Sequence, residues 1–394
     1  MVSREIVKGI YWVGAIDFDR RIFDELIPLP EGTSYNSYLI RGSEKTALID
    51  TVDPTKEFDL ISNIVRLNVD RIDYVIVNHA EQDHSGSLLM ILEFFPDAVV
   101  VTNEKCKDLL VALLHLPQNR VRVIADKETL SLGDRTLEFF LTPWTHWPET
   151  QITYLREDKI LFPCDLFGSH TGTSELYVTD EAQCYRSAKR YYAEIMMPFR
   201  NSIKGYVEMV KKLPLEMIAP SHGPIYRHPQ FILDAYADWV SDTVKNEVVI
   251  AYVSMHGSTE KMVEHLTGAL ISRGITVRPY NLTRTDIGEL AMSLVDTATV
   301  VIATPTVLFG PHPQVVYATY LANMLKPKMR FASVIGSYGW GGQATETIVK
   351  MLTHVKVDLI EPVMVRGLPD EMTFKALDRL ADTIVQKHKG IAIL

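Results

Sequence analysis

Cysteine is scarce in this sequence. Among 394 residues there are three cysteines, Cys106, Cys164 and Cys184, and no two of them form a CxxC pair. An odd number at wide spacing indicates neither a disulfide framework nor a thiolate metal site. We therefore expect a protein of the reducing cytoplasm.

Long apolar runs and an excess of positive charge are also missing. No run approaches the roughly 18 to 20 apolar residues of a membrane span, and the N-terminus has no hydrophobic signal region. The 40 lysine and arginine residues are outnumbered by 49 aspartate and glutamate residues, which gives a net charge of −9. Proteins that neutralise rows of phosphates carry the opposite balance. We expect no membrane insertion, no export and no nucleic-acid binding.

Hydrophobic patterning divides the chain into two parts. From residue 35 to about 165, short β-rich runs alternate with helical stretches, and a more helical section with one last strand-like run at 216–220 follows. From residue 247 onward, amphipathic helices alternate with five apolar strands, at 248–253, 276–281, 299–304, 331–335 and 357–365. The second pattern predicts an open, doubly wound parallel sheet. We expect two α/β domains, residues 1–246 and 247–394.

Histidines and carboxylates gather just past apolar strands in the first part. Four of them follow the run at 74–77 with a spacing that suits an extended loop folded around an ion, and three more each follow another strand. These candidates are His79, Glu81, Asp83, His84, His146, Asp165 and His222. Seven ligands are too many for one tetrahedral ion but suit two ions that share a bridging carboxylate. Mixed imidazole and carboxylate ligation favours non-haem iron over zinc.

A loop rich in hydroxyls and glycine follows the strand at 248–253. Residues 254–259, Ser-Met-His-Gly-Ser-Thr, lead into an amphipathic helix that we expect to begin near Glu260. Backbone N–H groups, hydroxyls and the helix dipole suit a phosphate there, although simple helix capping explains the same residues. The loop lacks the lysine of a triphosphate-binding loop and the glycine pattern of a dinucleotide site. A single phosphate, such as that of FMN, fits better.

Two more loops lie where doubly wound sheets bind ligands. The loop at 304–310 follows the third predicted strand, and the loop at 336–342, with two aromatic residues among four glycines, follows the fourth. Glycine lets the backbone approach a heteroaromatic edge while an aromatic ring stacks on its face. The three loops together predict an FMN site with these candidate contacts: Ser254, Met255, His256, Gly257, Ser258, Thr259, Pro305, Thr306, Val307, Leu308, Ser337, Tyr338, Gly339, Trp340 and Gly341.

The first set of residues resembles the metallo-β-lactamase superfamily, whose hydrolases carry His-x-His-x-Asp-His at this place. Here Glu81 replaces the second histidine, and the resulting His-x-Glu-x-Asp-His loop is similar to that of the flavodiiron proteins, or A-type flavoproteins. The segments His146-Trp147-Pro148 and Pro220-Ser221-His222-Gly223 also match that family. The resemblance covers nearly the whole chain. It implies a metallo-β-lactamase-like αββα sandwich followed by a flavodoxin-like domain.

The resemblance also implies cofactors and roles. Two irons would be held by the seven ligands with Asp165 as the bridge, and residues 254–259 would hold the FMN phosphate. The isoalloxazine would lie against Thr306, Tyr338, Gly339 and Trp340. Tyr191 would be a proton or hydrogen-bond donor near the irons. His170, on the loop after Asp165, is a candidate catalytic residue that would contact the metal ligands from outside, or else a residue of the surface. His388 is expected to be an ordinary helix or surface residue.

Two ferrous ions and reduced FMN together store the four electrons that reduction of dioxygen to water takes, and reduction of nitric oxide to nitrous oxide takes fewer. Because the sequence ends soon after the fifth predicted strand, we expect an external donor, which in relatives is rubredoxin or a reduced deazaflavin coenzyme. The family resemblance implies a head-to-tail homodimer or a dimer of dimers.

Two alternatives stay open: a zinc hydrolase with an accessory flavodoxin-like domain, and a flavin electron carrier with a structural metal.

Overall fold

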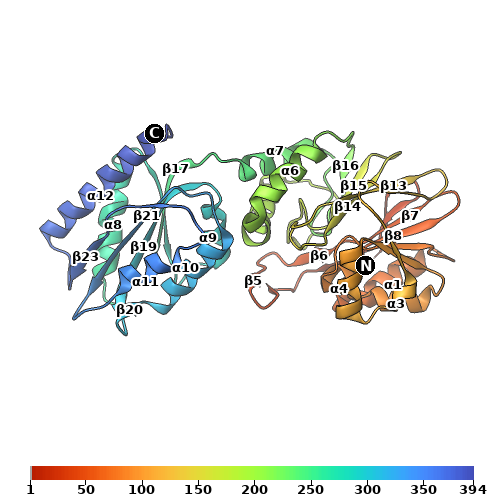
Figure 1. Cartoon of the computed structure of the whole chain (residues 1–394), viewed down its shortest axis with the longest axis horizontal. Helices are drawn as coiled ribbons and strands as arrows, with labels where there is room; N and C mark the ends of the chain where they lie inside the picture. The colour runs from red at the N-terminus through yellow and green to blue at the C-terminus, as the bar shows by residue number, and fades with distance from the viewer. Residues whose placement is uncertain (1) are drawn as a thin grey trace. The chain divides into compact units, whose positions relative to one another are not determined.

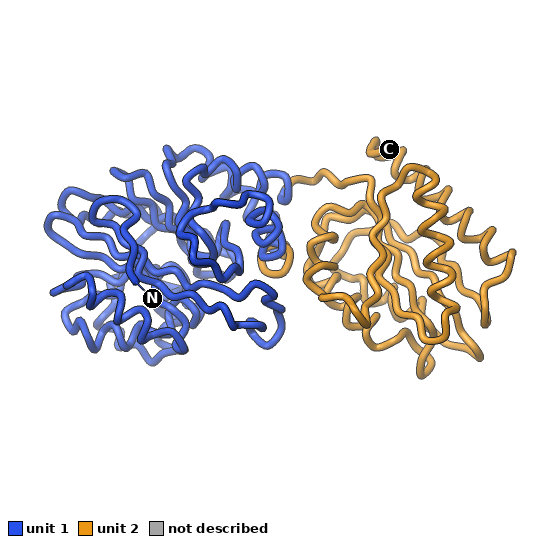
Figure 2. The backbone as a smooth tube through the Cα atoms, turned by 180° about the vertical axis from the view of Figure 1, so that it is seen from behind, with its two compact units in different colours: residues 1–192, 199–240 blue, residues 193–198, 241–394 orange. Residues whose placement is uncertain are grey.

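The computed structural model of the protein describes residues 2–394, which form two compact units (Figure 2). The first unit runs to Tyr192 and resumes from Phe199 to Val240, and the second comprises Ala193–Pro198 and Ser241–Leu394. Within residues 2–394, none of the helices combines the length and the apolar character that crossing a bilayer takes.

The first unit holds two large sheets and the helices around them (Figure 1). Its strands are Arg4–Val7 (β1), Ile10–Trp12 (β2), Ala15–Asp17 (β3), Ile22–Phe23 (β4), Ile27–Pro28 (β5), Thr33–Tyr35 (β6), Tyr38–Arg41 (β7), Thr46–Ile49 (β8), Tyr74–Ile76 (β9), Val99–Thr102 (β10), Val121–Val123 (β11), Thr129–Ser131 (β12), Thr136–Leu141 (β13), Gln151–Leu155 (β14), Ile160–Phe162 (β15) and Met217–Ile218 (β16). Its α-helices are Glu57–Arg66 (α1), Gln82–Ser85 (α2), Leu88–Phe94 (α3), Glu104–Leu114 (α4), Glu181–Tyr191 (α5), Arg200–Val210 (α6) and Pro229–Val240 (α7).

These elements stack as a metallo-β-lactamase-like αββα sandwich. One sheet has the order β1-β2-β7-β8-β9-β10-β11 and the other the order β12-β13-β14-β15-β16. Ile76 of the first sheet and Phe139 of the second belong to the apolar cluster between the sheets. Leu60 of α1, Leu88 of α3 and Leu110 of α4 pack on the outer face of the first sheet, and α6 and α7 lie beside the second (Figure 1). The predicted fold class of this part is confirmed.

The second unit is a flavodoxin-like parallel sheet with helices on both faces. Its strands are Lys245–Tyr252 (β17), Thr276–Asn281 (β18), Thr297–Val307 (β19), Gly310–Pro311 (β20), Phe331–Tyr338 (β21), Asp358–Leu359 (β22) and Val363–Arg366 (β23). Its α-helices are Ser258–Ile271 (α8), Ile287–Leu294 (α9), Pro313–Leu325 (α10), Ala344–Met351 (α11) and Glu371–Gly390 (α12). The sheet order β18-β17-β19-β21-β22 is the 2-1-3-4-5 order of flavodoxin. Helices α8 and α12 cover one face, and α9, α10 and α11 the other (Figure 1).

Several boundaries differ from the predictions. β19 and β21 run about three residues further than expected. They pair with each other as far as Pro305 and Ser337, and β20 and β23 pair with their last residues, so the candidate loops begin as strands. The fifth predicted strand is divided into β22 and β23, and α8 begins two residues before Glu260. The short strands β1 to β6 were not predicted, since runs of two to four residues carry little periodicity.

His388 is not a surface residue. It lies on α12 with no exposed surface, and its ring nitrogens lie 2.7 Å from Thr299 Oγ1 and 2.8 Å from Asn246 Oδ1. This histidine therefore ties α12 to β19 and β17. Burial lowers its pKa to about 4.

Candidate metal centre

The seven predicted ligands meet at one edge of the sandwich, just past β9, β13, β15 and β16. They form two groups whose donor atoms lie within 4.8 Å of one another: His79, Glu81, His146 and Asp165 in the first, and Asp83, His84 and His222 in the second. The sequence placed these side chains after strands, and the strand ends bring them together.

A change of backbone conformation divides the run after β9 between the two groups. His79 and Glu81 precede α2, whereas Asp83 and His84 belong to this one-turn helix. The predicted extended alternation is therefore wrong for the second half of the run. Successive residues of a helical turn point about 100° apart instead of to opposite sides. The neighbours Asp83 and His84 can therefore both contribute to the group that contains His222.

Asp165 lies between the two groups. Its Oδ2 atom is 3.6 Å from Nε2 of His79 and 3.6 Å from Nε2 of His146. Its Oδ1 atom is 3.0 Å from Nε2 of His84 and 3.4 Å from Nε2 of His222. Each carboxylate oxygen thus faces a different group, which is the arrangement of a carboxylate that bridges two ions.

The electrostatics of the centre favour ionised carboxylates. Burial alone raises the pKa of Asp165, but His84, His222 and His79 outweigh it and hold the pKa well below its usual range. Burial alone lowers the pKa of His222, but the neighbouring carboxylates of Asp165 and Asp83 raise it to about 10. The carboxylates therefore offer negative oxygen donors to a cation.

Unpartnered buried atoms fit a metal pair. Within residues 2–394, neither carboxylate oxygen of Asp83 nor Nε2 of His84 has a hydrogen-bond partner, although all three are buried. Asp83 Oδ2 is only 3.2 Å from His84 Nε2 and 3.0 Å from His222 Nε2. Buried polar atoms that lie this close without hydrogen-bond alignment are costly unless a cation satisfies them. The donor set is mixed imidazole and carboxylate, which suits iron.

Outer contacts orient the imidazoles. His79 Nδ1 lies 2.6 Å from Oε1 of Glu149, a fully buried carboxylate that also accepts a bond of 3.1 Å from Ala80 N. His222 Nδ1 donates to Ser34 O at 2.6 Å. Both contacts leave Nε2 free for a metal. Sequence reasoning missed Glu149, although it follows directly on the His146-Trp147-Pro148 segment.

Tyr191 and His170 lie beside the centre. The Tyr191 hydroxyl donates to Asp165 Oδ1 at 2.8 Å. His170 is buried, not on the surface: its ring centroid is 4.8 Å from that of His222 and 4.9 Å from that of Tyr191, and Nδ1 lies 2.9 Å from Thr33 Oγ1. Burial lowers the pKa of His170 well below its usual value. Cys164, which the sequence left without a role, has its sulfur near the donor atoms of His84 and Asp165.

The predicted phosphate loop lies between β17 and α8 in the second unit. Gly257 takes a φ of +83° before the first turn of α8, a conformation that favours glycine. Ser258 Oγ lies 2.7 Å and Thr259 Oγ1 3.3 Å from Ser337 Oγ at the end of β21. A helix N-terminus and three hydroxyls thus converge at the carboxyl ends of the strands, as a phosphate requires.

The other candidate flavin contacts lie at strand ends and in the loops that follow them. Pro305, Thr306 and Val307 end β19, Tyr338 ends β21, Gly339 and Gly341 lie in the loop after β21, and Met255 and His256 are exposed. Leu308 is 87% and Trp340 71% exposed, and the Trp340 ring meets Phe309 edge-on at 4.7 Å. Exposed apolar side chains beside a hydroxyl cluster fit a flat heteroaromatic ring that carries a phosphate.

Comparison with known proteins agrees with both predicted domains. The model of the ODP family beta lactamases matches residues 33–223, and the flavodoxin model matches residues 250–378. A nitric oxide reductase of Moorella thermoacetica is 37% identical over 90% of each chain. The structure of rubredoxin oxygen:oxidoreductase from Desulfovibrio gigas has a TM-score of 0.93 and 30% identity, covering 98% of this chain and 99% of that one. The flavodiiron protein of Giardia intestinalis has a TM-score of 0.89 and 28% identity, covering 98% of each chain.

Proposed function

The chain belongs to the flavodiiron proteins, and on that premise we propose that it reduces dioxygen to water, nitric oxide to nitrous oxide, or both. It is an oxidoreductase with FMN in the flavodoxin-like unit and a non-haem diiron centre in the other. The bound irons would supply the centre at which the gas is reduced, and bound FMN would supply the electrons.

The position of Asp165 between the two ligand groups carries this proposal. Each of its oxygens faces two imidazoles, so a pair of ions would share one carboxylate. His79, Glu81 and His146 would hold one iron, and Asp83, His84 and His222 the other. The Tyr191 hydroxyl would keep Oδ1 of the bridge in place, and Glu149 would keep the His79 ring in place.

The residue that separates this function from hydrolysis is Glu81. Its Oε2 atom lies 3.0 Å from His79 Nε2 and 3.1 Å from His146 Nε2. The zinc hydrolases of this fold carry a histidine at this position of the sequence motif. A carboxylate at this point adds negative charge to the first group and suits iron better than zinc. A hydrolase would also leave the flavin unit without a role.

We further propose the partners and setting that the family resemblance implies. An external donor, rubredoxin or a reduced deazaflavin coenzyme, would reduce FMN. A head-to-tail homodimer or a dimer of such dimers would place the flavin of one chain against the diiron centre of another. The cytoplasm suits the three cysteines, all of which are free. The functional boundary at residue 246 would fall just inside β17, between the two family matches.

The test is gas consumption by the purified, fully loaded protein. The protein is reduced without oxygen and then mixed with dioxygen or nitric oxide, while an electrode records the loss of gas and chromatography records nitrous oxide. We expect consumption of at least one gas. A protein that holds both cofactors and consumes neither gas would contradict the proposed function.

A further inference from the structure

We infer that a cavity on the far side of His170 is the solvent chamber from which protons reach the diiron centre, and that the Thr171 hydroxyl links the two. The inference rests on the proposed function, because only gas reduction consumes protons at this place. Reduction of dioxygen to two waters takes four electrons and four protons. Fully reduced FMN carries two of each and two ferrous ions carry two electrons, so two protons must come from the medium.

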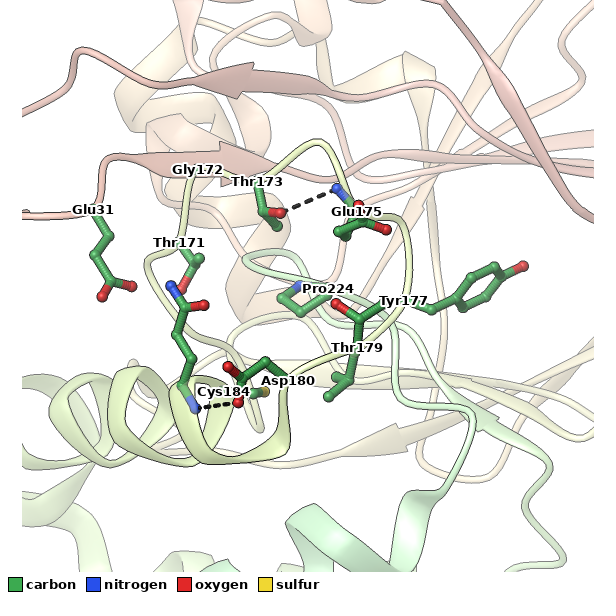
Figure 3. Close-up of a pocket in the computed structure, with 12 residues that line it drawn as sticks. Glu31, Thr171, Gly172, Thr173, Glu175, Tyr177, Thr179, Asp180, Cys184 and Pro224 are labelled. Atoms are coloured by element: carbon green, nitrogen blue, oxygen red, sulfur yellow. Dashed lines mark hydrogen bonds between the residues drawn. The ribbon is translucent and has the colours of Figure 1, made fainter.

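The cavity has a volume of about 140 Å³ and is lined by the segment 171–180, the start of α5 and Glu31 (Figure 3). Three carboxylates line it, those of Glu31, Glu175 and Asp180, and its lining includes no lysine or arginine. By volume it has room for several water molecules. The carboxylates favour protons and other cations in this space over anions.

A run of unpartnered polar atoms leads from the cavity toward the centre. Ser169 Oγ, His170 Nε2 and Thr171 Oγ1 are buried, and none has a hydrogen-bond partner in the described part of the chain. Thr171 lines the cavity and is 8% exposed. Three adjacent residues with this property are unusual, because buried polar atoms bond to protein or to ordered water. Water that enters from the cavity is the partner that we assign to them.

The run ends against the ligands of the centre. The His170 ring packs against the rings of His222 and Tyr191, and the Tyr191 hydroxyl bonds to Asp165. His170 Nδ1 is already engaged by Thr33, so Nε2 is the ring atom left to meet water. Protons that enter at Thr171 therefore reach the residues in contact with Asp165, namely His222 and Tyr191, without crossing apolar core.

A second, smaller cavity supports the same route. Its lining includes Thr173 and Glu175, which also line the first cavity, and Ser34 and Gly223, together with Arg4 and several apolar side chains. Ser34 accepts the bond from His222 Nδ1, and Gly223 follows His222. Its volume of about 10 Å³ is close to the space that one water occupies. The two cavities thus share lining residues, and the smaller one lies next to two neighbours of His222.

The kinetic test uses the loaded, reduced protein and the variant Thr171→Val, which removes the hydroxyl and keeps the shape. Stopped-flow mixing with dioxygen in weak buffer follows proton uptake with a pH-indicator dye and flavin oxidation by absorbance. We expect Thr171→Val to slow proton uptake by about tenfold with unchanged iron and FMN. Thr171→Ser, which keeps the hydroxyl, should restore the rate. Thr179→Val, which removes a hydroxyl from the exposed rim of the same cavity, should leave the rate unchanged.

A second readout does not depend on turnover. A crystal structure should show ordered water within hydrogen-bond distance of Thr171 Oγ1 and His170 Nε2, and this water should be lost in Thr171→Val. A wild-type uptake rate in Thr171→Val, or a dry run between the cavity and His170, overturns the inference. If Thr171→Val loses iron, Glu175→Gln on the shared wall carries the same prediction. Absence of gas consumption by the wild type, with the water present, would instead count against the proposed function.

Discussion

Glu149 offers a sharp test of the metal centre, because it contacts the site only through another residue. Its Oε1 atom accepts from His79 Nδ1 at 2.6 Å and from Ala80 N at 3.1 Å. Burial raises the pKa of Glu149, but the bond to His79 outweighs burial and keeps the carboxyl ionised. The charged bond fixes the ring so that Nε2 faces the first ligand group, and it makes this nitrogen more basic.

The size of the effect follows from those two bonds. Removal of such an outer partner costs about 10- to 100-fold in metal affinity, which is about 1.4 to 2.8 kcal/mol. In Glu149→Gln the amide oxygen can still accept both bonds but without charge, and a charge-assisted bond is roughly twice as strong as a neutral one. We therefore expect Glu149→Gln near the tenfold end and Glu149→Ala near the hundredfold end.

The assay is competition for ferrous iron between the protein and a coloured chelator without oxygen. Glu93→Gln serves as the control, because Glu93 is exposed on α3 and is not one of the ligands. Its iron affinity should equal that of the wild type. If Glu149→Ala also binds iron as tightly as the wild type, the orienting role assigned to Glu149 is refuted.

Three further predictions concern other parts of the chain. Asp165→Asn removes the charge of the proposed bridge, so iron content measured by elemental analysis should fall; unchanged iron would exclude the bridge. Replacing Ser258 and Thr259 together by Ala should weaken FMN binding, measured by fluorescence titration, by about tenfold or more and spare iron; undiminished affinity would place the phosphate elsewhere. Between about pH 6.5 and 4, unfolded chains bind a proton that the buried His388 does not. The free energy of unfolding should therefore fall by up to about 3 kcal/mol as pH drops through this window. His388→Gln should flatten that slope in urea titrations.

The sequence was most informative about residue types and least informative about backbone conformation. Four histidines and three carboxylates after strand ends were enough to predict one site, because strands of a sandwich end at shared edges. The division of His79 and Glu81 from Asp83 and His84 was not predictable, since it depends on a helical turn of four residues that the pattern does not signal.

Contacts between distant residues were also hidden. Glu149 lies 70 residues from His79, and His388 lies 89 residues from Thr299, so neither pairing appears in local periodicity. In the second unit, the extent of β19 and β21 depends on pairing with each other and with β20 and β23 rather than on their own composition. The open parallel sheet was predictable, because regular alternation of strands and helices is typical of doubly wound folds.

The diiron centre is tested most directly by the metal and flavin content of protein purified without added metal. We expect about two irons per chain, for the two ligand groups that share Asp165, together with one FMN. Two zincs per chain, from cells supplied with iron, would contradict it.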